Sequence, residues 1–152
     1  MKIVKVFVAS SSELKQERME LVDLFQDMND EYREQGIKWK PVLWEYMDSS
    51  MRSKRKEDEY LEQLRGCEVC IVLFWRTIGE YTMEELDVAN TEMLLGRRPR
   101  KIHIFFKELE DGASVEAVDL IKHCYEMYPD VSYKTFNDVL SLRNLVKHWI
   151  VN

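Results

Sequence analysis

The spacing of apolar residues along the chain changes repeatedly between two patterns, one typical of strands and one typical of helices. Apolar runs rich in branched and aromatic residues predict five strands, at residues 3–9, 37–44, 69–75, 102–106 and 131–136. Between them, apolar residues recur every three or four positions, which predicts helices. They are expected at residues 13–35 and 57–64, from the turn that contains Glu85 to about residue 95, around 115–125 and around 140–149. Strand and helix therefore alternate along the chain.

This alternation predicts a fold of the α/β class. Strands joined by helices favour parallel pairing with right-handed crossovers, so we expect a three-layer, doubly wound sheet of five parallel strands. The third strand, residues 69–75, is continuously apolar, as expected at the centre of such a sheet. Pro41 cannot donate a ladder hydrogen bond, which favours an irregular or an edge position for the second strand. With 152 residues and no linker or internal repeat, residues 1–152 are expected to form one domain.

Four loops are expected at the carboxyl edge of this sheet, where ligands bind in open α/β folds. They are residues 10–12, 44–48, 75–82 and 107–111, and they carry hydroxyls, aromatic rings and carboxylates. Apolar walls with a few directed polar groups are typical of a cleft for a small molecule. Aromatic residues at strand ends are also common in protein cores, so both interpretations are open at this point.

Two of these loops also carry helix-capping signals. Ser10 with Glu13, and Thr82 with Glu85, have the spacing of a capping box, in which two side chains satisfy backbone N–H groups at the start of a helix. The turn at residues 10–12 is therefore interpreted as a helix cap first and as a phosphate-binding turn second. For Glu85, spacing alone likewise favours a capping role.

Glu85 also has a chemical interpretation, because it lies in the first turn of the predicted helix that follows the central strand. There the positive end of the helix dipole favours an ionised carboxylate. Such a group is a poor general acid. It is suited to accepting hydrogen bonds from sugar hydroxyls and to stabilising the positive charge that develops when a glycosidic bond breaks.

Composition and charge exclude several classes of function. The chain has 22 basic and 28 acidic residues, and the net charge of −6 argues against nucleic-acid binding. No apolar run approaches the roughly 20 residues that span a bilayer and no signal-peptide pattern is present, so a cytoplasmic protein without a membrane partner is expected. Three cysteines without zinc spacing predict reduced thiols and no metal site. The dispersed histidines are given no role: His103, His123 and His148.

Several nucleotide-binding motifs are missing from the sequence. There is no GxGxxG and no GxxxxGK[ST] pattern, and with 5 glycines in the chain the backbone cannot approach a pyrophosphate at the first turn as a dehydrogenase requires. The first strand lacks the acidic pair, and the third lacks the terminal aspartate, of a phospho-accepting receiver domain. Hydride transfer and aspartyl-phosphate signalling are therefore disfavoured.

The order of several motifs resembles the Toll/interleukin receptor (TIR) domain superfamily, in particular its bacterial TIR-like branch. The resemblance covers about residues 3–107, and it rests on the segment Val-Phe-Val-Ala-Ser-Ser at residues 6–11, Glu17-Arg18, Trp44-Glu45, the buried strand that ends at Trp75, and Glu85-Leu86 with Ala89. It implies a flavodoxin-like fold. In catalytic members it also implies cleavage of the nicotinamide–ribose bond of NAD by a glutamate at the position of Glu85, with Glu84 as the neighbouring alternative.

The first hypothesis is therefore an NAD glycohydrolase or cyclase in bacterial defence or signalling, for which NAD is the substrate and no cofactor is needed. Glu85 would be its catalytic residue. The binding residues would be Ser10 or Ser11, Trp44 and Tyr81, with Trp75 as a further candidate; Tyr81 replaces a tryptophan that is frequent in the family. The basic segment at residues 52–56 would either attract the anionic dinucleotide or form a solvated loop.

Two other hypotheses remain open. One is a self-association module without catalysis, in which the basic segment at residues 97–101 meets the acidic first helix of another copy. The other is an enzyme similar to nucleoside deoxyribosyltransferases, which act on free nucleosides with a glutamate. These alternatives predict different partners: a second copy of the chain in one case, and a nucleoside in the other.

Overall fold

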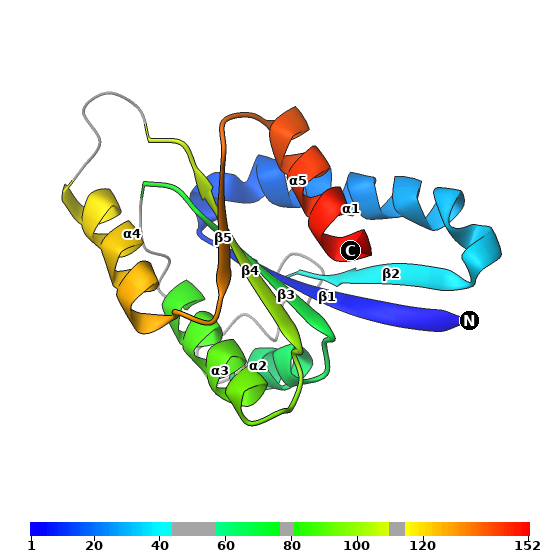
Figure 1. Ribbon diagram of the computed structural model, residues 1–152, viewed down its shortest axis with the longest axis horizontal. Coiled ribbons are helices and arrows are strands. Elements are labelled where there is room, and N and C mark those ends of the chain that lie inside the picture. Colours follow the sequence, from blue (N-terminus) through cyan, green and yellow to red (C-terminus); the bar gives the residue numbers. More distant parts are fainter. Residues whose placement is uncertain (44–56, 77–80, 110–114) are drawn as a thin grey trace.

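Helices cover both faces of a parallel sheet (Figure 1). The computed structural model describes residues 1–43, 57–76, 81–109 and 115–152. Within them the strands are β1 (Lys2–Ser10), β2 (Ile37–Val42), β3 (Val69–Phe74), β4 (Lys101–Lys107) and β5 (Ser132–Phe136). The helices are α1 (Lys15–Glu31), α2 (Glu57–Arg65), α3 (Thr82–Leu94), α4 (Val115–Met127) and α5 (Val139–Val151). Short 3-10 turns at Ser12–Leu14 and Arg33–Gln35 flank α1.

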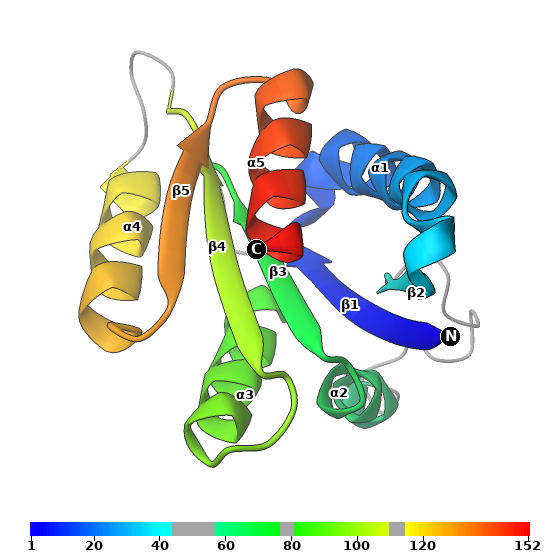
Figure 2. The ribbon, with the colours of Figure 1, turned by 45° about the vertical axis from the view of Figure 1, so that its right-hand side comes forward.

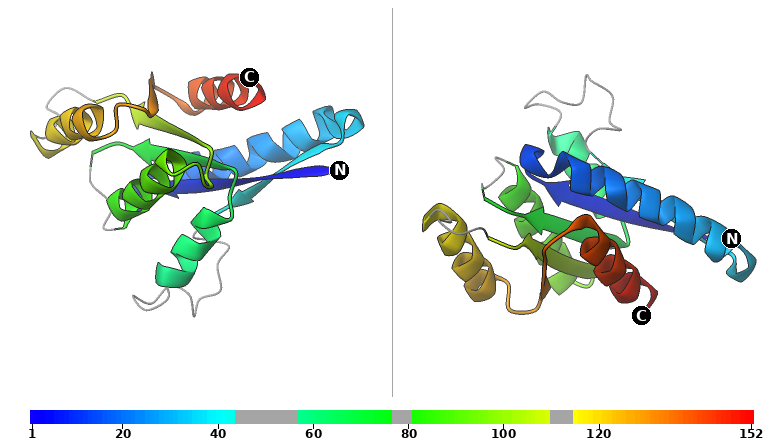
Figure 3. Two further views of the ribbon diagram at one scale, coloured as in Figure 1. Left: turned by 60° about the horizontal axis from the view of Figure 1, so that its bottom comes forward. Right: turned by 90° about the horizontal axis from the view of Figure 1, so that it is seen from above.

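The sheet has the order β2-β1-β3-β4-β5, and every neighbouring pair is parallel. Helices α1 and α5 cover one face, while α2, α3 and α4 cover the other (Figure 2). The right-hand view of Figure 3 shows α1 and α5 in front of the sheet. This arrangement confirms the prediction of a three-layer, flavodoxin-like sheet of five parallel strands.

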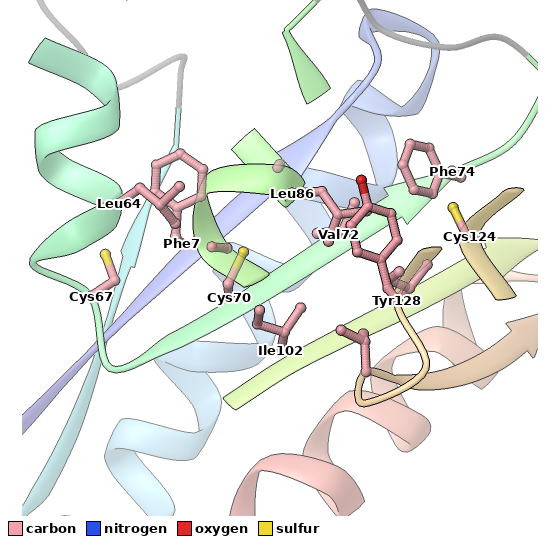
Figure 4. Close-up of a cluster of buried hydrophobic side chains, with 14 of the residues drawn as sticks. Phe7, Leu64, Cys67, Cys70, Val72, Phe74, Leu86, Ile102, Cys124 and Tyr128 are labelled. Atoms are coloured by element: carbon pink, nitrogen blue, oxygen red, sulfur yellow. The ribbon is translucent and has the colours of Figure 1, made fainter. Parts of the chain in front are cut away.

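The core is built on the central strand, as predicted from its apolar run. All residues of β3 are buried, and successive side chains point to opposite faces. Cys70, Val72 and Phe74 belong to the cluster under α2, α3 and α4 (Figure 4), whereas Ile71 and Leu73 belong to the cluster under α1 and α5. Each face of β3 therefore contacts a separate hydrophobic layer.

The edge position predicted for the second strand is also confirmed. Among the described strands β2 pairs with β1 alone, and Pro41 lies within it opposite Val6. Helix α1 ends before Gly36, whose φ of 71° favours glycine and directs the chain into β2. No described helix has both the length and the apolar character that crossing a membrane requires.

The acidic face of α1 is partly neutralised within the chain. The guanidinium of Arg143 on α5 lies 3.0 Å from a carboxylate oxygen of Asp23 and 2.9 Å from one of Asp27. Lys147, one turn further along α5, lies 2.7 Å from Glu31. These pairs link two helices that pack on the same sheet face, so part of the acidic surface that self-association would use is engaged by α5.

Candidate functional site

Three strand ends and one helix start meet at the carboxyl edge of the sheet. Strand β1 ends at Ser10, β3 is followed by Trp75, β4 ends at Lys107, and α3 begins at Thr82. This is the edge at which the sequence predicted a ligand site. Two of the predicted features, Trp44 and the basic segment at residues 52–56, lie outside the described residues.

Glu85 lies in the first turn of α3 with only 5% of its surface exposed. The neighbouring Glu84 is exposed. The two carboxylates therefore have different environments although they are adjacent in sequence. Of the two, Glu85 has the burial expected for a group that acts in a water-poor site, where charge stabilisation is stronger than in solvent.

The capping box predicted for Thr82 and Glu85 is wrong. Helix α3 begins at Thr82, so Tyr81 occupies the capping position, and it makes no side-chain capping bond. The backbone N–H of Glu85 donates instead to the carbonyl oxygen of Tyr81 at 2.9 Å. Because the helix starts one residue earlier than the motif requires, the Thr82 side chain is buried and Glu85 is not engaged in that reciprocal cap.

The charge of Glu85 acts on the face of the sheet that α2, α3 and α4 cover. Leu86 and Ala89, in the same helix, belong to this core cluster. Burial raises the pKa of the Cys70 thiol on β3, and the Glu85 carboxylate raises it further. Cys70 is therefore a neutral, buried thiol and a poor nucleophile.

The other thiols have the same character. Cys67 and Cys124 are free and buried, and burial raises the pKa of each to about 12. In the described part of the chain, no group of three or more histidine, cysteine or acidic side chains is arranged to hold a metal ion.

Ser10 and Ser11, both predicted to bind ligand, are held by Arg18 of α1. The guanidinium Nη1 of Arg18 donates to Ser10 Oγ and, at 2.8 Å, to the carbonyl oxygen of Ser11. The capping box predicted for Ser10 and Glu13 is wrong, because the first helical turn starts at Ser12 and its capping residue, Ser11, makes no side-chain capping bond. Ser11 Oγ donates to Glu13 at 3.3 Å instead. Arg18 is 6% exposed, so this contact is an internal one.

Two cations lie close to the ring of Trp75. The Arg76 guanidinium carbon is 3.5 Å from the centroid of the Trp75 ring, and Lys107 Nζ is 4.1 Å from it. Trp75 also packs against the core layer under α1 and α5. These contacts favour a structural role for the ring, and its role in ligand binding stays a prediction.

A partly buried ion pair lies next to Trp75, and we call this pair together with Ser10, Ser11 and Arg18 the polar cluster. Lys107 Nζ lies 2.9 Å from a carboxylate oxygen of Glu17, whose side chain is 6% exposed. Because Glu17 and Arg18 are adjacent on α1, one turn of helix contacts the ends of both β1 and β4. The Glu17-Arg18 pair was recognised in the sequence only through the family resemblance, and neither its contacts nor Lys107 as a partner of Glu17 was predicted. The signal was present, because both residues fall between Leu14 and Leu21 on the buried side of the helix.

The carboxyl edge thus has two groups of candidate residues. Tyr81 and Glu85 belong to α3 and its capping residue. Ser10, Ser11 and Trp75 are associated with the polar cluster on the α1 side. The structure places both groups at the same edge of the sheet, and a hollow that joins them stays a prediction.

His103, in β4, is a buried titratable group on the α5 face of the sheet. It is 3% exposed and its ring lies 4.1 Å from that of Phe105 and 5.0 Å from that of Trp149, measured between centroids. Neither ring nitrogen has a hydrogen-bond partner in the described part of the chain. Burial lowers the pKa of His103 to about 4 from 6.5, and the charge of Lys134 adds to this effect.

We expect His103 to make the folded state sensitive to acid. Below pH 6.5 the histidine of the unfolded chain takes up a proton, whereas that of the folded chain stays neutral to about pH 4. The free energy of unfolding should therefore fall between these two values, by up to about 3 kcal/mol. Denaturation of the wild type and of His103→Phe across this range measures the effect. The variant should have the shallower slope, and equal slopes would contradict the assignment.

Comparisons with known proteins support the fold. No protein-family model matches the sequence, and no curated protein gives a significant match. Among solved structures, the CMP N-glycosidase BcmB of Clostridium botulinum is similar with a TM-score of 0.60 at 14% identity, covering 95% of this chain and 98% of that chain. A short-chain flavodoxin associated with a non-canonical PDU bacterial microcompartment is similar with a TM-score of 0.54 at 10% identity, covering 99% of this chain and 98% of that chain. At these identities, the likeness shows a shared α/β fold.

Proposed function

We propose that this protein hydrolyses the N-glycosidic bond of a nucleotide, with Glu85 as the catalytic carboxylate. The observation that carries the proposal is the burial of Glu85 in the first turn of α3, at the carboxyl edge of the sheet, beside a neighbouring Glu84 that is exposed. At a helix start, the helix dipole interacts favourably with an ionised carboxylate and offsets part of the cost of burying its charge. Glu85 is therefore placed to act on a developing positive charge.

In the proposed reaction, the bond between ribose C1′ and the base nitrogen breaks, and both electrons leave with the base. The sugar carbon gains positive charge, which the Glu85 carboxylate stabilises directly or by forming a transient bond to C1′. Water then adds to C1′ and loses a proton, which goes to the departing base when that base is cytosine and to solvent when it is nicotinamide. The products are a free base and a sugar phosphate or ADP-ribose. When the base is nicotinamide of NAD, it carries a positive charge before cleavage and leaves as a neutral molecule, so this substrate needs no proton donor.

Two independent similarities support cleavage of an N-glycosidic bond. The sequence motifs resemble TIR domains, whose catalytic members cleave NAD, and the fold is similar to that of a CMP N-glycosidase. NAD is the substrate that we propose first, because the motifs that resemble NAD-cleaving TIR domains include Glu85 itself. Nucleoside monophosphates come second, and the transferase-like alternative would instead act on deoxynucleosides.

Release of free base from a substrate panel tests the proposal. Purified protein is incubated with NAD, with CMP and the other nucleoside monophosphates, and with deoxynucleosides, and the bases are separated by liquid chromatography. Protein concentration is varied and a crowding agent is added in parallel, because self-association completes the site in some TIR enzymes. We expect nicotinamide from NAD. If base is released from CMP and not from NAD, the substrate is a nucleoside monophosphate. If no nucleotide releases its base under any condition, the proposal is overturned.

A further inference from the structure

A second candidate binding site lies at the opposite edge of the sheet from Glu85. A cavity of about 490 Å³ opens beside the first residues of β1, β2, β3 and β4, including Lys2, Ile37, Val69 and Lys101. Strand β1 has nine residues, so its two ends are separated by roughly 25 to 30 Å. In the right-hand view of Figure 3, the N-terminus, the end of α1 and the C-terminus lie on this side of the molecule. The cavity is thus remote from the proposed catalytic residue.

The interior of the cavity is apolar and partly aromatic. Its lining includes the buried side chains Val4, Trp39 and Val69, and Ile150 of α5 contributes to the wall. Tyr32 also lines it, with its ring edge-on to Trp39 and the two centroids 5.3 Å apart. Cavities of roughly 300 to 1,000 Å³ with such walls are typical of small-molecule sites. The interior therefore suits an apolar or aromatic body.

The charged residues around the cavity are mostly basic. Lys2, Arg100 and Lys101 line it and are exposed. Among the described residues, Glu68 is the one acidic residue in the lining. Its two carboxylate oxygens lie 3.3 Å from the guanidinium groups of Arg98 and Arg100. Lys2 and Lys101 form no ion pair within the described part of the chain. In a protein with a net charge of −6, this local excess of positive charge favours an anion at the rim.

We propose that this cavity binds a small amphipathic anion, meaning a molecule with an apolar or aromatic body and one carboxylate, sulfonate or phosphate group. The body packs against Trp39 and Tyr32, and the anion lies near Lys2 and Lys101. The positions of the helix ends favour the same orientation of the bound molecule. Helices α1 and α5 both end at this cavity, and their negative dipole ends disfavour an anion there. The anionic group is therefore expected near the first residues of β1 and β4, which carry Lys2 and Lys101; Lys101 Nζ also lies 5.8 Å from the centroid of the Trp149 ring on α5.

A matched pair of fluorescent probes tests this proposal without reference to catalysis. The first probe, 8-anilinonaphthalene-1-sulfonate, has aromatic rings and a sulfonate, and N-phenyl-1-naphthylamine has the same rings without the charge. Lys101→Glu reverses a charge at the rim, and Lys122→Glu makes the same change at an exposed position on α4, remote from the cavity. We expect one saturable site for the sulfonate, weakened roughly fivefold to tenfold by Lys101→Glu and unchanged by Lys122→Glu. Binding of the uncharged probe should differ little among the three proteins.

The position of the probe is read from methyl NMR spectra of the wild type. Addition of the sulfonate should shift the methyl signals of Val4, Val69 and Ile150. Lys2→Glu serves as a second rim variant if Lys101→Glu does not fold, which circular dichroism would reveal. The proposal is overturned if no saturable site is found, if the shifted methyl groups lie elsewhere, or if the rim and control variants weaken binding equally.

Discussion

Replacement of Glu85 by glutamine is expected to reduce base release by roughly 1,000-fold or more, equivalent to about 4 kcal/mol in the activation barrier. The variant keeps the shape of the side chain and a polar group at the same buried position, but it removes the negative charge. Without that charge, the developing positive charge on the ribose loses the counter-ion that we propose for it. The loss should therefore appear in kcat more than in KM, and single-turnover kinetics with the best substrate of the panel measures it.

Glu84→Gln is the matched control for this experiment. It makes the same chemical change one residue earlier in α3, at an exposed position. Activity of this variant should stay within about twofold of the wild type, because a solvated charge at that distance is largely screened. If Glu84→Gln loses activity and Glu85→Gln keeps it, the assignment shifts by one residue. If both keep it, neither carboxylate takes part in the chemistry.

Replacement of Lys107 by methionine is expected to reduce the free energy of unfolding by about 1 to 3 kcal/mol, because it leaves the Glu17 carboxylate without its counter-ion at a largely buried position. The two groups lie 2.9 Å apart, and their side chains are 23% and 6% exposed respectively. The substitution also removes the cation over Trp75. Denaturation with urea at neutral pH measures the loss.

A double-mutant cycle separates the ion pair from the packing around it. In Glu17→Met/Lys107→Met both charges are replaced by apolar groups of similar length, so most of the stability lost in Lys107→Met should return. Lys122→Met, at an exposed position on α4, controls for the general effect of removing a lysine and should cost less than about 0.5 kcal/mol. Equal losses in the single and double variants would show that packing, and not the buried charge, determines the effect.

The fold was predictable because several patterns in the sequence agree. The continuous apolar run at residues 69–75 indicated a strand buried on both faces, and β3 lies at the centre of the sheet with every residue buried. Pro41 indicated an edge strand, and β2 is one. Alternation of strand and helix then left few ways of connecting them, because crossovers between parallel strands are right-handed. Local pattern and global topology point to the same structure here.

The helix starts were predicted less well, and the reason is local. Both capping boxes failed by one residue, since α3 begins at Thr82 itself and the first turn near α1 begins at Ser12. A motif of four residues sets only an approximate boundary, and tertiary contacts decide the rest. At the end of β1 the deciding contact is made by Arg18, which donates to Ser10 Oγ and to the Ser11 carbonyl oxygen. The Ser10 hydroxyl oxygen, which would have accepted the capping hydrogen bond, is therefore already engaged.

The candidate site was only partly predictable for a similar reason. Because Ser10, Trp75 and Glu85 follow predicted parallel strands, the sequence indicated the edge of the sheet at which they lie. It did not indicate which side chains contact one another there. The contact between Glu17 and Lys107 joins residues 90 positions apart in sequence. The aromatic lining of the second cavity likewise depends on how Tyr32 and Trp39 meet after a turn. Such contacts depend on packing in three dimensions, which a single sequence does not reveal.

The position of a bound nucleotide tests the central claim most directly. Crystals of the Glu85→Gln variant, soaked with NAD or with the nucleotide that the panel identifies, should trap the substrate before cleavage. We predict that ribose C1′ lies within about 3.5 Å of the carboxamide of residue 85, at the carboxyl edge of the sheet. A nucleotide bound elsewhere, with residue 85 enclosed by protein and out of reach of the sugar, would contradict the proposed role of Glu85.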